Sequence, residues 1–315
     1  MKICVIGAGG WGKNHINTLN KLNVLNGIVD FNNELLNSFT DINKSCKLFT
    51  SIEQTFEESF DGYVIATPAE THYSIASQLL KKGKNILVEK PVCLKYSEAK
   101  ELYGIALEKK CFIMGGHLLL FHPAFIKMNE LVKNNKIGKM CYLYSNRLNF
   151  GKVRSHENAM WSLAPHDISL LLFFCNTFPE KISYNGSRLL GRDIEDSSIS
   201  SFDFPDDIGA HIFVSWLHPF KEHRLVVIGS EAMISFEDSA EGKPLTLYSK
   251  KIDLVNGIPE KIDGPKEIIE YDDKMPLEAE LEYFINTKKP LISNGENGRD
   301  VVRILVEASK HLELK

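Results

Sequence analysis

A glycine-rich turn between an apolar strand and a helix constrains the fold of this chain more than any other feature. The strand pattern Lys2–Gly7 runs into Gly7-Ala8-Gly9-Gly10-Trp11-Gly12, and a helix pattern follows over Gly12–Leu22. In G-x-G-x-x-G the first glycine permits a tight turn, the second lets backbone approach a pyrophosphate, and the third lets helix and strand pack closely. The helix N-terminus then favours phosphate groups. The motif alone is a weak signal, but in this context it predicts a dinucleotide-binding domain.

An acidic residue at the end of the next strand favours NAD over NADP. Asp30 ends the strand predicted over Gly27–Asp30, 18 residues after Gly12. A carboxylate at this position can accept hydrogen bonds from the ribose hydroxyls. It would repel a 2′-phosphate, and the residues that follow supply no cation to hold one. A glycine turn without a ligand stays open as the alternative.

Strand and helix patterns alternate through the first 120 residues. Further strands are expected at Tyr63–Thr67, Asn85–Glu89 and Phe112–Gly115, and further helices at Ile52–Phe60, His72–Lys82 and Ser97–Lys109. This alternation predicts a parallel sheet with helices on both faces. We therefore expect residues 1–120 to form a Rossmann domain that binds NAD.

The pattern changes after about residue 120, where strands follow one another with few helices between them. The expected strands are Met140–Asn149, Ser197–Phe204, Ala210–Trp216, Leu225–Ile228 and Met233–Phe236, and the expected helices are Pro123–Lys133, His166–Cys175, Pro276–Asn286 and Gly298–Leu312. Such a run of strands predicts a mostly antiparallel sheet. The length of 315 residues favours two domains. We therefore predict an α/β protein with domains at residues 1–120 and 121–315.

Composition and charge argue against several classes of protein. The net charge of −4 argues against a surface that coats nucleic acid. No apolar run approaches the roughly 20 residues that span a bilayer, and no secretory signal is visible. The six cysteines form no CxxC pair, so neither a metal site nor a redox dithiol is indicated. We expect a cytoplasmic protein with buried free thiols and no membrane or nucleic-acid partner.

Two residues at predicted element ends are candidates for proton chemistry. Lys90 follows the strand Asn85–Glu89, at the sheet edge where ligands bind in open α/β folds, and Pro91 favours an extended backbone before it. His166 opens an apolar helix, whose positive dipole end favours a neutral ring that can act as a base near pH 7. A surface lysine and a structural histidine remain alternatives.

These motifs in their order resemble the Gfo/Idh/MocA family of sugar and polyol oxidoreductases. The resemblance rests on the glycine turn, Asp30, Thr67-Pro68, Glu89-Lys90-Pro91, His166 and the C-terminal stretch from Lys289 to Gly295. It implies a Rossmann domain followed by an α/β domain with a large open sheet, used for substrate binding and for assembly into a homodimer or tetramer. The implied cofactor-binding residues are Gly7, Gly9, Gly10, Trp11, Gly12, Asp30, Thr67, Pro68, His72, Glu89 and Lys90.

The resemblance also implies catalytic roles for two side chains. Lys90 would be the family lysine that touches the reacting hydroxyl, and His166 the acid/base of the family's Asp-x-x-x-His motif. This chain carries Ser162 where the family has the aspartate. Lys90 and His166 are therefore the expected catalytic pair, meeting at one alcohol oxygen, and no third member is assigned.

Three further stretches are similar to those family members that oxidise carbon 3 of UDP-N-acetylglucosamine. They are His117–Pro123, Asn146–Arg154 and the stretch from Glu157 to Asp167. The similarity implies a 3-keto product that passes to an aminotransferase, giving a diamino sugar for lipid A. Arginine binds phosphate in a bidentate manner, so the cations Arg147, Lys152 and Arg154 are candidates for the diphosphate, as is Arg224 in a second candidate loop after His218, Lys221 and His223. The expected substrate-binding residues are His117, Arg147, Asn149, Lys152, Arg154, Trp161, His166 and Arg224.

Three other functions stay open at this point. A family enzyme acting on a free sugar or a polyol such as an inositol would not need the cations between Arg147 and Arg154. An NAD-binding sensor without turnover would keep the glycine turn but would have no use for Lys90 beside a neutral His166. An enzyme similar to biliverdin reductase or dihydrodiol dehydrogenase fits the stretch around His166 less well.

Overall fold

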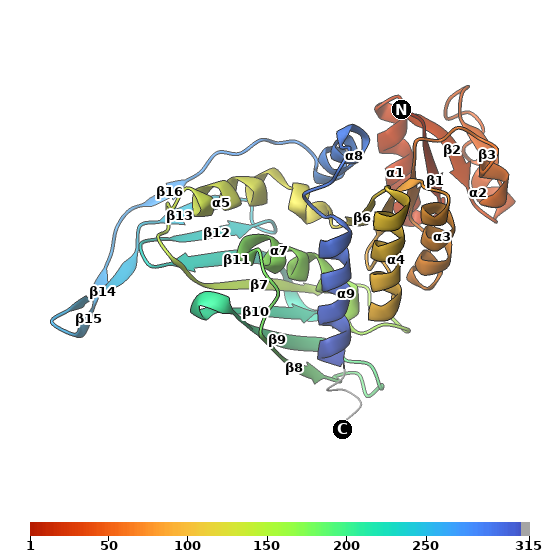
Figure 1. The fold of residues 1–315 in the computed structure, drawn as a ribbon. Helices are drawn as coiled ribbons and strands as arrows, with labels where there is room; N and C mark the ends of the chain where they lie inside the picture. The colour runs from red at the N-terminus through yellow and green to blue at the C-terminus, as the bar shows by residue number, and fades with distance from the viewer. Residues whose placement is uncertain (310–315) are drawn as a thin grey trace. The chain divides into compact units, whose positions relative to one another are not determined.

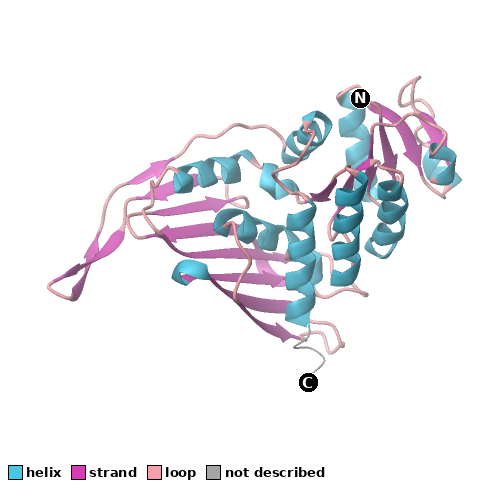
Figure 2. Cartoon of the chain, viewed as in Figure 1, coloured by secondary structure: helices cyan, strands magenta, loops and turns pink. Residues whose placement is uncertain are grey.

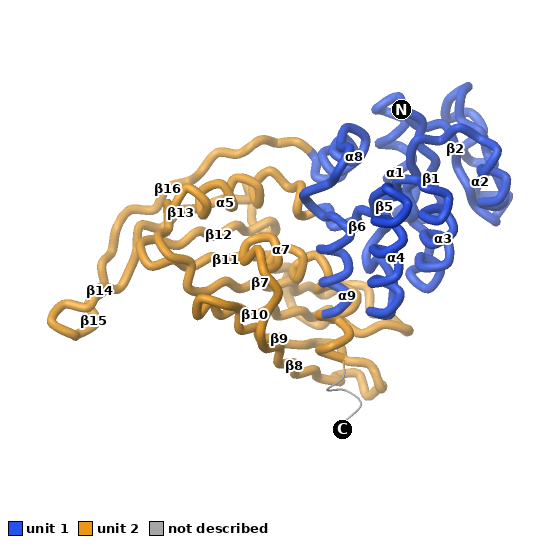
Figure 3. Tube along the Cα trace, in the orientation of Figure 1, with its two compact units in different colours: residues 1–118, 275–303 blue, residues 119–274, 304–315 orange. Residues whose placement is uncertain are grey.

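A computed structural model describes residues 1–309, and the chain divides into two compact units (Figure 3). The first unit combines residues 1–118 with residues 275–303, and the second combines residues 119–274 with those from 304 onward. The segment 275–303, which the sequence pattern places in the second domain, thus lies in the first unit. It does so because side chains such as Leu281 and Phe284 are buried there, with the Phe284 ring 5.8 Å from that of Phe112.

The first unit is built on a six-stranded parallel sheet in the order β3-β2-β1-β4-β5-β6 (Figure 1). Its strands are β1 (Ile3–Ile6), β2 (Leu25–Val29), β3 (Lys47–Phe49), β4 (Gly62–Ile65), β5 (Asn85–Glu89) and β6 (Ile113–Gly116). Almost every residue of the central strands is buried, which explains their continuous apolar runs. The strand order reverses between β1 and β4, and such a switch point is where these folds bind ligands.

Helices cover both faces of this sheet, as predicted. They are α1 (Gly10–Lys21), α2 (Asn33–Asn37), α3 (Ala69–Lys81), α4 (Tyr96–Lys109), α8 (Pro276–Asn286) and most of α9 (Gly295–Ser309). α1 packs against α8, and α3 packs against α4. Right-handed crossovers place α1 on one face and the α3–α4 pair on the other, because β2 and β5 lie on opposite sides of β1.

The second unit is an eight-stranded sheet in the order β16-β13-β12-β11-β7-β10-β9-β8. Its strands are β7 (Met140–Phe150), β8 (Lys181–Ser187), β9 (Ser197–Phe204), β10 (Ile208–Ser215), β11 (Leu217–Gly229), β12 (Met233–Glu237), β13 (Leu245–Tyr248) and β16 (Lys266–Ile268). Its pairs are antiparallel except β7 with β10, which confirms the prediction of a mostly antiparallel sheet. β14 (Lys251–Val255) and β15 (Ile258–Ile262) form a separate hairpin.

Helices lie against the strands of this second sheet, cyan beside magenta in Figure 2. Three helices of the described chain belong to this unit, and they carry part of the candidate site. They are α5 (Pro123–Lys133), α6 (Ala159–Leu163) and α7 (Pro165–Cys175). α5 contacts β12, while α6 and α7 contact β10. Leu143 and Ser145 of β7 are buried, whereas Tyr142 and Tyr144 between them are only half-buried. The alternation of a β-strand therefore gives β7 one buried face and one more open face.

Several predicted elements differ from those observed. The helix expected over Ile52–Phe60 is only a 3₁₀ turn at Glu53–Thr55. The helix expected over Gly298–Leu312 begins earlier, at Gly295, and its expected end lies outside the described residues. All six cysteines are free, as expected, but only Cys4 and Cys93 are buried. Cys141 is exposed, and the other three are half-buried. Within residues 1–309, no helix has the length and apolar character needed to cross a bilayer.

Candidate active site

The glycine turn joins β1 to α1 at the carboxyl edge of the first sheet. A Cβ on Gly12 would lie 1.9 Å from the carbonyl oxygen of Gly7, and Gly7 itself has a φ of +96°. Both positions therefore require glycine. At Gly9 and Gly10, by contrast, an added Cβ would meet open space. Gly9 is the N-cap of α1 and has no side chain to occupy the first N–H groups. The turn thus offers free donors on an open surface, which fits the pyrophosphate of NAD.

Asp30 lies at the end of β2, beside the glycine turn. Its Oδ2 accepts a hydrogen bond of 2.7 Å from the backbone N–H of Ala8, and its Oδ1 accepts one of 2.9 Å from Asn32. These two donors fix the carboxylate next to the turn, as the ribose-binding role requires. Asn32 also caps α2 by accepting from Glu34, so the segment after Asp30 turns away and presents no cation there.

Glu89 is the centre of a buried polar cluster at the end of β5. The indole Nε1 of Trp11 and the Nε2 of His15 both contact its Oε1, the latter at 2.7 Å. The backbone N–H of Lys90 donates to its Oε2 at 3.1 Å. Trp11 and His15 lie on α1, so this single carboxylate ties the glycine turn to the strand that carries Lys90. His15 was not among the residues predicted from the sequence, although it follows Gly12 by about one helical turn and shares its buried face.

Lys90 and His117 lie close together at neighbouring strand ends. Burial lowers the pKa of His117 to about 4; the Glu89 carboxylate acts in the opposite direction, and the Lys90 ammonium lowers this pKa further. His117 is therefore neutral near pH 7. Lys90 itself is half-buried, and the Lys90–Pro91 peptide is cis. The structure thus brings together one predicted catalytic residue and one predicted substrate-binding residue.

His72 connects the ends of β4 and β5 through main-chain contacts. Its Nδ1 lies 2.8 Å from the carbonyl oxygen of Pro91, and its Nε2 lies 2.8 Å from that of Thr67. Both ring nitrogens of this buried residue are therefore occupied by the protein itself. The hydroxyl of Thr67 also accepts a bond of 2.6 Å from Thr71. His72 thus holds the loops after β4 and β5, which carry Thr67, Pro68 and Lys90.

In the second unit, His166 lies in the first turn of α7, beside a buried ion pair. The carboxylate of the next residue, Asp167, accepts hydrogen bonds from the Nε of Arg147 at 2.6 Å and from its Nη2 at 3.0 Å. It also accepts one of 2.6 Å from the hydroxyl of Ser145. Asp167 is fully buried, and 13% of the Arg147 side chain is exposed. The predicted phosphate-binding Arg147 is therefore engaged with α7, where it fixes the helix start that carries His166.

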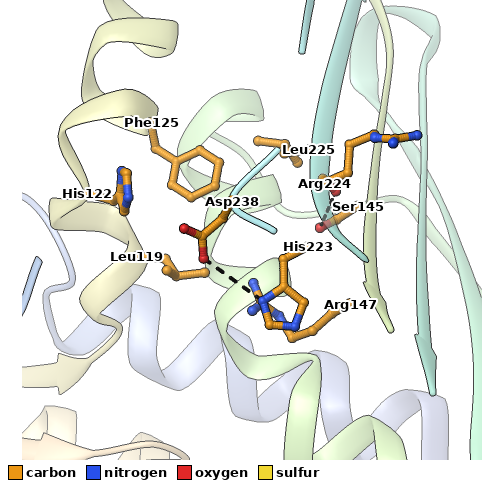
Figure 4. Close-up of a pocket in the computed structure, with 9 residues that line it drawn as sticks. All are labelled: Leu119, His122, Phe125, Ser145, Arg147, His223, Arg224, Leu225 and Asp238. Atoms are coloured by element: carbon orange, nitrogen blue, oxygen red, sulfur yellow. Dashed lines mark hydrogen bonds and ion pairs between the residues drawn. The ribbon is translucent and has the colours of Figure 1, made fainter. Parts of the chain in front are cut away.

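A small pocket lies next to this ion pair (Figure 4). It is lined by Leu119, His122, Phe125, Ser145, Arg147, His223, Arg224, Leu225 and Asp238. Its accessible volume of about 10 Å³ holds about one water, so it is too small for a sugar. Burial, reinforced by the Arg147 cation, lowers the pKa of His223 to about 4. His223 is therefore neutral near pH 7 and forms no charged pair with Asp238, 4.0 Å away.

The structure does not bring all the predicted substrate-binding residues together. Arg224 pairs across the sheet with Asn146, whereas its neighbour His223 pairs with Arg147. Arg224 and Arg147 therefore project from opposite faces of the sheet, because adjacent strand residues alternate. The guanidinium of Arg224 is engaged by Glu237 at 2.6 Å and by Glu222 at 3.3 Å.

The remaining predicted residues follow β7 or lie on α6. The Oδ1 of Asn149 is buried and has no hydrogen-bond partner within residues 1–309. Lys152 and Arg154 are exposed in the loop after β7, where Arg154 lies 3.5 Å from Glu157. The indole of Trp161 donates to Ser309 at 2.9 Å. Lys152 and Arg154 thus keep exposed cationic groups available to a ligand, while the Asn149 Oδ1 is buried and the Trp161 nitrogen is already bonded.

Comparison with known proteins connects these features to one family. Residues 1–117 match the family described as "Oxidoreductase family, NAD-binding Rossmann fold", and residues 125–235 match the "GFO/IDH/MocA C-terminal domain". The UDP-N-acetylglucosamine 3-dehydrogenase of Acidithiobacillus ferrooxidans is 27% identical over 320 residues, which cover 98% of each chain.

Solved structures agree over nearly the whole chain. A structure of the Acidithiobacillus enzyme matches with a TM-score of 0.84 at 25% identity, covering 98% of this chain and 96% of the other. An oxidoreductase from Magnetospirillum magnetotacticum matches with a TM-score of 0.83 at 26% identity, covering 97% and 98%. These matches confirm the predicted fold class, and the match of residues 1–117 to the NAD-binding Rossmann family confirms NAD as the cofactor. The chain is an oxidoreductase that belongs to the Gfo/Idh/MocA family.

Proposed function

We propose that this protein oxidises carbon 3 of UDP-N-acetylglucosamine to the 3-keto sugar with NAD. One observation carries the proposal: the match to the Acidithiobacillus UDP-N-acetylglucosamine 3-dehydrogenase covers 98% of both chains. It therefore includes both units rather than the Rossmann domain alone. In the wider scheme, the keto product would pass to an aminotransferase and serve the synthesis of a diamino sugar for lipid A.

Two side chains would handle the hydroxyl proton in this reaction. Bound NAD would accept the hydride that leaves carbon 3. Lys90 extends from the end of β5, where its ammonium can hydrogen-bond the reacting oxygen and stabilise negative charge as it develops. His166 would take the hydroxyl proton as a general base. Its place at the start of α7 supports this role, because a helix N-terminus disfavours a cationic ring.

Other residues would hold the substrate rather than react with it. Arg147 and Asp167 fix the start of α7 through their paired hydrogen bonds, and so position His166. The exposed loop cations Lys152 and Arg154 are the remaining candidates for the diphosphate, since Arg224 is bound by Glu237. We therefore assign diphosphate binding to the loop after β7 and leave Arg224 out of it.

A substrate panel tests the proposal directly. Purified protein is incubated with NAD and UDP-N-acetylglucosamine, UDP-glucose, N-acetylglucosamine or myo-inositol, and the absorbance of NADH is followed. We expect turnover with UDP-N-acetylglucosamine at a kcat/KM at least about 100-fold above the free sugar, because the diphosphate supplies binding energy. Preferential oxidation of myo-inositol would identify a polyol dehydrogenase. Tight NAD binding without turnover on any compound would identify a sensor.

A further inference from the structure

A buried acid on α8 has no role in the reaction described above. Glu280 is completely buried, and neither of its carboxyl oxygens has a hydrogen-bond partner within the described residues. Burying a charged carboxylate without a partner is costly, and such a group takes up a proton instead. Burial, reinforced by the nearby Glu89 carboxylate, raises the pKa of Glu280 well above its ordinary value. Glu280 is therefore a neutral acid, with one O–H donor to place.

A buried histidine on the adjacent helix α1 has one ring nitrogen without a hydrogen-bond partner among the described residues. His15 is fully buried on α1, and α1 packs against α8. Its Nε2 contacts Glu89 at 2.7 Å, while its Nδ1 has no hydrogen-bond partner among residues 1–309. Because a carboxylate only accepts, Nε2 must carry the proton, and a neutral ring then leaves Nδ1 as an acceptor. The region thus holds an unused acceptor on α1 and an unused donor on α8.

Glu89, the carboxylate near this acid, already has three contacts of its own. Glu89 is contacted by Trp11 and His15 and by the backbone of Lys90. His117, a further buried titratable side chain near Glu89, is kept neutral near pH 7 by its own burial. The two carboxyl oxygens of Glu280 and the Nδ1 of His15 are thus three buried polar atoms without a partner among the described residues, and an ordered water makes two to four hydrogen bonds to such atoms.

We propose that Glu280 is a protonated positioning residue that donates, through a bridging water, to Nδ1 of His15 and thereby fixes the hydrogen bonds of Glu89. The bridge sets the His15 tautomer so that Nε2–H faces Glu89. Glu89 in turn holds Trp11 of the glycine turn and the backbone of Lys90. The C-terminal helix α8 thus supports the NAD-binding turn. Its effect on Lys90 rests on the proposed function, whereas its effect on NAD binding does not.

Spectroscopy of the sugar-free protein tests the protonation states. Infrared difference spectra between wild type and Glu280→Gln at pH 7 should show a carboxylic acid C=O band that is present only in wild type. ¹⁵N NMR should show His15 as the neutral Nε2–H tautomer. A wild-type spectrum without the acid band, or a cationic His15, would overturn the proposal.

Variants of two residues on α8 test whether Glu280 supports NAD binding. Glu280→Leu removes the donor and should weaken NAD affinity, measured calorimetrically, by roughly 10-fold, the usual scale for a lost buried hydrogen bond. Glu280→Gln keeps an N–H donor and should restore most of that affinity. Glu278→Leu, which loses only a surface contact of 3.0 Å with Lys21, is the matched control.

The positioning role of Glu280 and the proposed function can be rejected independently of each other. Equal NAD affinity in Glu280→Leu and Glu280→Gln would reject the positioning role even if the enzyme oxidises UDP-N-acetylglucosamine. Conversely, the absence of turnover on any sugar would reject the proposed function while leaving these affinities interpretable. If Glu280→Leu does not fold, the infrared and NMR measurements on wild type and Glu280→Gln still decide whether Glu280 is protonated and whether His15 is the neutral Nε2–H tautomer.

Discussion

Lys90 and His166 are the side chains on which the proposed chemistry depends, and each can be removed alone. Lys90→Ala and His166→Asn should each lower kcat at least about 100-fold, the usual contribution of a positioned acid or base. NAD affinity should change little in His166→Asn, because the cofactor turn lies in the other unit. Steady-state kinetics with UDP-N-acetylglucosamine measure both effects.

Each of these variants has a matched control elsewhere in its unit. Lys288 is an exposed lysine of the first unit, and His218 on β11 contacts Phe220 through the backbone carbonyl, 3.0 Å from its Nδ1, and through the ring, at 4.5 Å between centroids. Lys288→Ala and His218→Asn should keep wild-type rates. If Lys90→Ala or His166→Asn also turned over at the wild-type rate, that residue would have no part in proton transfer.

The contact between β7 and α7 rests on the ion pair of Arg147 with Asp167. Arg147→Leu leaves the fully buried Asp167 carboxylate without its cation, and breaking one side of such a pair costs about 3–5 kcal/mol of unfolding free energy. Replacing both residues, as in Arg147→Leu with Asp167→Asn, should recover part of that loss. Urea denaturation measures the three proteins. A single variant as stable as wild type would show that the pair contributes nothing.

Elements with buried, continuous apolar runs could be predicted from the sequence, and exposed ones could not. β4 and β5 are buried along almost their whole length, so their residues carry the strand signal directly. β15 is exposed at every position, and β8 alternates between exposed and half-buried residues. Both lack the apolar run that distinguishes a strand. At Ile52–Phe60 helical spacing of apolar residues suggested a helix, yet only one 3₁₀ turn forms.

The candidate site was predictable where chemistry follows a local motif. The glycine turn, Asp30 and Lys90 lie beside strand ends, and their order in the chain places them at one sheet edge. Arg224 was grouped with Arg147 by composition, but strand alternation places the two on opposite faces. Glu280 carried no signal, because its burial depends on packing between helices that are distant in sequence.

The pH dependence of stability is a property of the whole molecule. Burial lowers the pKa values of His117 and His223 from 6.5 to about 4, and those of His122 and His211 are lowered for the same reason. Between pH 6.5 and about pH 4 the unfolded chain therefore binds more protons than the folded chain. The unfolding free energy should therefore fall as the pH drops from about 6.5 to about 4, with a slope of up to ~1.4 kcal/mol per pH unit for each histidine.

Denaturation at several pH values checks this expectation. His223→Gln should flatten the slope in this window, because one buried group no longer titrates. The exposed His156 provides the control, and His156→Gln should leave the slope unchanged. A free energy of unfolding that stays constant between pH 6.5 and 4 would show that these histidines are as accessible to protons in the folded chain as in the unfolded one.

The return of residues 275–303 to the first unit has a consequence for protein engineering and for gene rearrangement. The cofactor-binding unit is not a contiguous cassette, since the second unit is inserted between its two parts. A fragment that stops at residue 118 would lack Leu281 and Phe284, which are fully buried in the intact chain. Its sheet would expose an apolar surface and favour aggregation. Because the chain returns to the second unit at residue 304, swapping the cofactor domain between relatives requires three splice points, after residues 118, 274 and 303, and the exchanged C-terminal segment must carry α8 along.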